Sequence, residues 1–78
     1  MALIDLTQLR PGEEGTVMDI QGGMGLMRKL ASLGIRPGVK VRKVSSQFMR
    51  GPVTIRIGNT QVAIGFGMAR RIIVEVKG

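Results

Sequence analysis

Residues 22–44 read GGMGLMRKLASLGIRPGVKVRKV, and this stretch decides the fold. After a glycine pair, apolar residues recur at helical spacing and predict a short helix over residues 24–33. Gly34 stands where helices commonly end with one residue in the left-handed conformation. The turn sequence Arg36-Pro37-Gly38 follows, and valines then alternate with basic residues, which predicts a strand over residues 39–44. Lys43 breaks this alternation and favours a β-bulge at that point.

The flanking sequence continues in short pieces of strand separated by turns. Alternating apolar residues predict further strands over residues 16–20, 53–57, 61–64 and 72–76, and Gly58-Asn59 is a tight-hairpin dipeptide. Residues 65–71 have room for one helical turn. Arg10-Pro11-Gly12 repeats the Arg-Pro-Gly sequence, which we interpret as two similar turns and not as two repeats. The pattern predicts an all-β single domain over residues 1–78: a partly open β-barrel of about five strands, with the helix between strands 1 and 2.

Composition excludes most enzyme classes. The 78 residues contain no cysteine and no histidine, so thiolate or imidazole metal ligands, disulfides and histidine-dependent catalytic triads are absent. We therefore expect no catalytic residue, no cofactor site and no metal site. The longest stretch without a charged residue, 57–69, is too short and glycine-rich to span a bilayer, and the N-terminus lacks the basic start of a secretory signal. These features predict a cytoplasmic protein.

The net charge of +7 is unevenly distributed. The first twenty residues carry a net charge of −3, and residues 21–78 carry +10 with Glu75 as their only acid. Such a basic body attracts phosphates, anionic lipid or an acidic protein surface. Nucleic acid is the obvious partner of a basic barrel, but barrels that grip single strands stack bases on aromatic side chains, and this chain has only Phe48 and Phe66. We consider nucleic acid an unlikely partner.

A nucleotide site and a metal site both fit the sequence poorly. The glycine-rich loop at residues 22–25 lacks the spacing of a phosphate-binding loop, so we interpret it as a connection between strand and helix. The five carboxylates offer only hard oxygen ligands for a metal. The six methionines could supply thioethers to a cuprous ion, but methionine far more often fills cores or adaptable contact surfaces.

The order of these signals resembles the FeoA family of small accessory proteins in bacterial ferrous iron transport. The most specific element is Leu33-Gly34-Ile35-x-Pro37-Gly38, preceded by the Gly-Gly loop and the short helix, and the similarity extends from Leu6 to Val76. The resemblance implies an SH3-like barrel, in agreement with the strand pattern. It also implies a role beside the large membrane permease that carries a cytoplasmic GTP-binding domain. Transition-metal binding is attached to this barrel at the family level, but the sequence offers no histidine or cysteine for it.

The sequence and the resemblance together lead to a non-enzymatic protein that acts by protein–protein interaction with the ferrous iron permease. We expect the contact surface to join the helix and its approach loop to a predicted turn that exposes large apolar side chains. Its residues are Met24, Met27, Arg28, Lys29, Phe48, Met49 and Arg50. Peripheral contact with the inner membrane surface and weak homo-oligomerisation stay open. The alternative hypothesis is a basic barrel that binds nucleic acid or acts in metal-dependent regulation.

Overall fold

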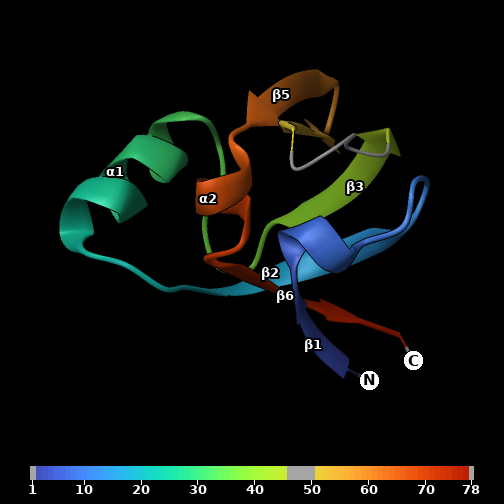
Figure 1. The fold of residues 1–78 in the computed structure, drawn as a ribbon, viewed down its shortest axis with the longest axis horizontal. Helices are drawn as coiled ribbons and strands as arrows, with labels where there is room; N and C mark the ends of the chain where they lie inside the picture. The colour runs from blue at the N-terminus through green and yellow to red at the C-terminus, as the bar shows by residue number, and fades with distance from the viewer. Residues whose placement is uncertain (1, 46–50, 78) are drawn as a thin grey trace.

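The computed structural model describes residues 2–45 and 51–77, and β-strands dominate them (Figure 1). The elements follow the chain in this order: β1 (Ala2–Asp5), the 3-10 helix η1 (Leu6–Gln8), β2 (Glu14–Ile20), α1 (Met24–Ser32), β3 (Lys40–Ser45), β4 (Val53–Ile57), β5 (Thr60–Ile64), α2 (Phe66–Ala69) and β6 (Ile72–Val76). The strands form one antiparallel sheet with the order β1-β6-β2-β3-β4-β5. Figure 1 shows α1 at one side of the molecule, well away from both chain termini.

Two features of the predicted barrel are corrected. The described residues form six strands, not about five, because Ala2–Asp5 pairs with β6 along its whole length. The sheet is not closed: β1 and β5 stand at opposite ends of the strand order, and each pairs on one side only within the described residues. The helix still lies between the two strands predicted to flank it, which are now β2 and β3.

The motif that follows α1 is a helix stop coupled to a turn. The N–H of Gly34 donates to the carbonyl of Ala31 (2.9 Å), and the N–H of Ile35 donates to that of Leu30 (2.9 Å). This is the Schellman arrangement, and Gly34 has the positive φ of +91° that it requires. The predicted left-handed glycine is therefore confirmed. Leu30 and Ile35 are both fully buried, which supplies the apolar contact that accompanies such a cap.

The turn after the helix cap places the start of β3 beside β2. The N–H of Val39 donates to the carbonyl of Arg36 (3.1 Å), and Gly38 between them has a φ of +95°. A proline at the second position of the turn and a left-handed glycine at the third are typical of a type II β-turn. Gly38 and Val39 then exchange hydrogen bonds with Val17 on β2 (2.7 and 2.8 Å), which starts the pairing of β2 with β3. The first Arg-Pro-Gly sequence forms the same kind of turn, with Gly12 at φ +85°, so the interpretation as two similar turns is confirmed.

The core lies inside the curved sheet, and the buried side chains of residues 2–45 and 51–77 are aliphatic apart from one lysine. Its buried hydrophobic members are Leu6, Leu9, Val17, Ile20, Leu30, Ile35, Val41, Val53, Ile55, Ile64, Ala69, Ile72, Val74 and Val76. Lys43 is only 3% exposed, and its Nζ donates to the carbonyl of Thr7 on η1 (3.2 Å). Burial lowers the pKa of Lys43, while the Asp5 carboxylate acts in the opposite direction. The register of the pairing between β3 and β4 shifts between Lys43 and Ser45, so the predicted bulge is confirmed. The buried lysine side chain links η1 to the sheet through its hydrogen bond to Thr7.

Candidate interaction surface

An apolar groove runs along one side of α1, and we call it the α1 groove. It has a volume of about 500 Å³. Its lining residues are Ile20, Met24, Met27, Arg28, Ala31, Ile35, Arg36 and Pro37. One wall is a helical stripe at spacings of three and four residues, and the other wall is the end of β2 with the loop that follows the helix cap.

The helix has two apolar stripes, and only one of them belongs to the core. Leu30 is fully buried and Leu26 packs against the core, so these residues hold α1 on the sheet. Met24 and Met27 lie on the other stripe and are 69% and 39% exposed. Large apolar side chains at such exposure next to a hollow are typical of contact surfaces, and the flexible thioether adapts to differently shaped partners.

The structure brings together part of the predicted contact surface. Met24, Met27 and Arg28 line the α1 groove as a group. Lys29 is exposed on the same helix but does not line the groove, because at about 100° per residue it lies on the side of α1 opposite the stripe formed by Met24, Met27 and Ala31. Phe48, Met49 and Arg50 lie outside the described residues.

Sequence reasoning missed a second, polar hollow beside the groove, which we call the arginine cleft. Gln21, Gly67, Arg70 and Arg71 line it, and its volume is about 310 Å³. The N–H of Gln21 donates to the carbonyl of Arg71 (2.7 Å), which ties the end of β2 to the start of β6. Only the pairing of β2 with β6 reveals that Gln21 meets Arg70 and Arg71, so no local sequence signal could have found the cleft.

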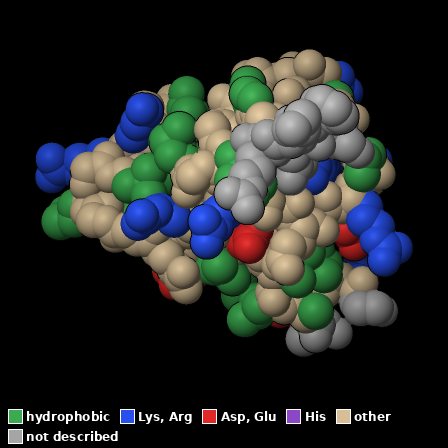
Figure 2. Space-filling view, viewed as in Figure 1, with side chains coloured by type: hydrophobic (Ala, Val, Ile, Leu, Met, Phe, Trp, Pro, Cys, Tyr) green, Lys and Arg blue, Asp and Glu red, His purple; other side chains and the backbone are tan. Residues whose placement is uncertain are grey.

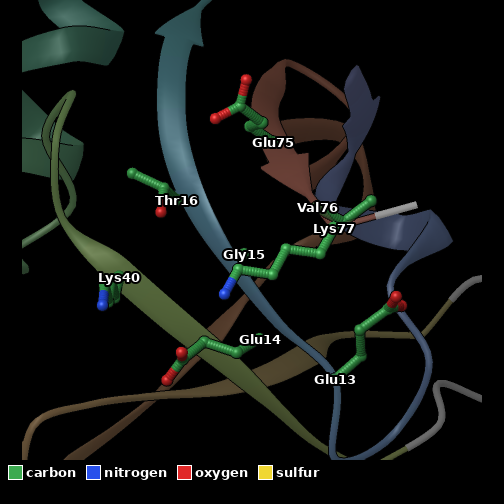
Figure 3. A pocket seen from close by; sticks show the side chains of 8 residues that line it. All are labelled: Glu13, Glu14, Gly15, Thr16, Lys40, Glu75, Val76 and Lys77. Atoms are coloured by element: carbon green, nitrogen blue, oxygen red, sulfur yellow. The ribbon is translucent and has the colours of Figure 1, made fainter. Parts of the chain in front are cut away.

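A third hollow tests whether the carboxylates form a metal site (Figure 3). It has a volume of about 350 Å³ and lies over β2, β3 and β6. Glu13, Glu14 and Glu75 line it together with Lys40 and Lys77, but Figure 3 shows the three carboxylates at separate points around the hollow. Within residues 2–45 and 51–77, no group of three acidic residues is placed to hold a metal ion. Glu14 instead forms an exposed ion pair with Arg42 (3.8 Å).

No helix of the described chain is long and apolar enough to cross a bilayer.

Comparison with known proteins identifies close relatives. A family model described as the FeoA domain matches residues 4–76. A Methanocaldococcus jannaschii protein named as a candidate Fe(2+) transport protein A is 41% identical over 66 residues, which are 85% of this chain and 78% of that protein. A crystal structure described as an iron uptake regulatory protein (FeoA) superimposes with a TM-score of 0.87 at 35% identity, covering 96% of this chain and 97% of that one.

The same fold also occurs as part of longer proteins. A manganese-dependent transcriptional repressor superimposes with a TM-score of 0.86 at 26% identity. The match covers 96% of this chain but 42% of the repressor, so the likeness concerns one portion of that protein.

Proposed function

This chain belongs to the FeoA family of non-enzymatic accessory proteins of iron transport, and from that premise we propose that it works by docking on a ferrous iron permease. The partner implied by the family resemblance carries a cytoplasmic GTP-binding domain. Docking on that domain supports or regulates Fe²⁺ uptake without moving iron through this protein itself. The α1 groove is the observation that carries the proposal.

Two properties of the α1 groove support a docking role. Its lining is mostly apolar, although it is open to solvent on the surface of a small domain. Met24 and Met27 project from a helix that is already fixed to the core by Leu30, so the surface exists before any partner binds. Preorganisation of this kind reduces the entropy cost of association.

The proposal places the protein in the cytoplasm, at or near the inner face of the cell membrane. The basic residues after position 20 support this location, because anionic lipid adds an attraction of about 1 kcal/mol for each nearby lysine or arginine. Lipid attraction then assists docking on a membrane-anchored partner.

The test replaces one groove methionine and compares it with a matched methionine elsewhere. Met27→Asp places a charge in the α1 groove, whereas Met18→Asp changes an exposed methionine on β2 that does not line the groove. Binding of each variant to the purified cytoplasmic domain of the permease is measured by calorimetry. We expect Met27→Asp to weaken binding about tenfold or more, since burying an unpaired carboxylate at an interface is costly, and Met18→Asp to leave the affinity within about twofold.

Circular dichroism of both variants controls for folding. A folded Met27→Asp variant with wild-type affinity would remove the groove from the proposed interface. Wild-type protein that shows no binding to the cytoplasmic domain would overturn the proposed function itself.

A further inference from the structure

The linings of the α1 groove and the arginine cleft meet at consecutive residues of the chain. Ile20 lines the groove, and the next residue, Gln21, lines the cleft. The hydrogen bond from Gln21 to Arg71 fixes the end of β2 between the two hollows. The linings of the two hollows thus meet at Ile20 and Gln21, and we name them together the combined surface.

Every charged side chain that lines the combined surface is positive. Arg28 and Arg36 line the groove, Arg70 and Arg71 line the cleft, and all four are exposed. In Figure 2, blue basic and green apolar side chains are interspersed on the side where Figure 1 draws α1.

No ion pair among the described residues involves these arginines. The ion pair found among the described residues joins Arg42 to Glu14, away from both hollows. Residues 46–50 contain no acidic residue in the sequence. Asp19 precedes Ile20 along the chain, but it lines neither hollow and its carboxylate accepts the N–H of Ile20 (2.9 Å). The combined surface thus presents unpaired positive charge around an apolar floor.

This combination selects among anionic partners. A phosphate backbone or a lipid headgroup would use the arginines and leave the apolar floor exposed to water. A peptide segment that carries both apolar and acidic side chains would satisfy both parts. The groove wall on α1 repeats at spacings of three and four residues, which matches the ridges of a second helix packed against it.

We infer that the combined surface binds an acidic amphipathic helix, with the apolar side chains of that helix on the floor of the α1 groove and its carboxylates on the arginines. The nine residues of α1 extend over about 13 Å, so the bound segment needs about two to three helical turns. The inference builds on the proposed function, because it specifies which chemistry the partner presents.

The experiment uses synthetic peptides, so that it does not depend on the permease. Two fluorescein-labelled 15-residue peptides share the same leucines at helical spacing, and the polar positions are glutamate in one and lysine in the other. Fluorescence anisotropy measures their affinity for the full chain, and amide chemical shifts locate the site. We expect the glutamate peptide to bind about tenfold more tightly or better, with shifts concentrated at Met24, Met27 and Ala31.

Charge-reversal variants supply the matched control. Arg36→Glu and Arg71→Glu should each weaken binding of the glutamate peptide about fivefold and strengthen binding of the lysine peptide. Arg56→Glu, an exposed arginine on β4 outside both hollows, should change neither affinity.

Three results would overturn the inference. They are equal affinity for the two peptides, shifts located away from the combined surface, and tighter binding to phosphatidylglycerol vesicles or a single-stranded oligonucleotide than to the glutamate peptide. If the glutamate peptide binds as expected but the permease domain does not bind, the inference survives and the proposed function fails. If the permease domain binds through Met27 without a preference for the acidic peptide, the proposed function survives and the inference fails.

Discussion

Replacement of Gly34 by alanine tests whether the end of α1 requires a residue in the left-handed backbone conformation. Gly34 has a φ of +91°, in the left-handed region that side chains disfavour. A Cβ built at this position would meet only the Cδ1 atom of Ile57, at 3.8 Å, which is an ordinary van der Waals contact. The cost of Gly34→Ala therefore comes from backbone strain and not from steric overlap, and we expect a loss of about 1–2 kcal/mol in the free energy of unfolding.

Gly25 in the first turn of α1 provides a control with the opposite expected sign. It has no positive φ, and a Cβ there would meet nothing within 4 Å. Alanine at this position gains helix propensity, so Gly25→Ala should stabilise the protein by about 0.5 kcal/mol. Both substitutions add a methyl group without steric overlap, one inside α1 and one just after its end, and the backbone conformation at the two sites sets the opposite signs.

Far-UV circular dichroism suits the measurement, because the chain contains no tryptophan or tyrosine. Urea titration gives the free energy of unfolding, and each kcal/mol shifts the melting temperature by about 4–8 °C in a domain of this size. Gly34→Ala should melt below the wild type and Gly25→Ala above it. If Gly34→Ala is as stable as the wild type, the helix stop does not depend on a left-handed residue and the reasoning is refuted.

Two further predictions concern a buried lysine and the exposed methionines. Because burial lowers the pKa of Lys43, the unfolded chain keeps the lysine proton to higher pH than the folded chain does. The free energy of unfolding of the wild type should therefore rise, relative to that of Lys43→Met, as the pH approaches 10.5. Urea titrations of both proteins from pH 8 to 10.5 measure this, and a difference in free energy that stays constant with pH would contradict it. Hydrogen peroxide should oxidise Met24, which is 69% exposed, to the sulfoxide before Met27 and long before the half-buried Met68. Peptide mass spectrometry at successive times measures the order of oxidation, and a different order would contradict the prediction.

The elements that the sequence predicted correctly are those set by local interactions. The helix, its left-handed glycine and the following turn each depend on hydrogen bonds between residues a few positions apart, such as Gly34 with Ala31. The Gly58-Asn59 hairpin between β4 and β5 is local in the same sense. Turn chemistry determines such features before tertiary packing contributes.

The features that were missed depend on pairing between distant parts of the chain. Leu3 and Ile4 are neighbouring apolar residues in Ala2–Asp5, so the segment lacks the alternation that marked the other strands. It becomes one because β6 offers a free edge. The same pairing gives the sheet an additional edge strand in place of the closure that the sequence favoured.

The part of the candidate site that lies on α1 was predictable from local sequence, and the part that depends on pairing across the sheet was not. Met27 was predicted for the contact surface, and it is 39% exposed and lines the α1 groove, because α1 packs on the sheet through a narrow stripe that also leaves Leu33 nearly as exposed. The sequence does not show how wide the buried stripe is, because that width depends on how much of the sheet lies beneath the helix. The arginine cleft depends on pairing across the sheet and has no counterpart in the local sequence.

The helix cap and the candidate site share residues, and this has a consequence for how the surface can vary. Ile35 closes the Schellman cap, is fully buried and also lines the α1 groove, and Pro37 begins the turn to β3 while forming part of the same wall. Changes at these positions alter the fold and the groove together. Met24 and Met27 contribute to the groove without being buried in the core, so partner preference can change there at little cost in stability. The wall formed by Ile35 and Pro37 thus sets the position of the α1 groove, and substitutions at Met24 and Met27 can change which partner the groove binds.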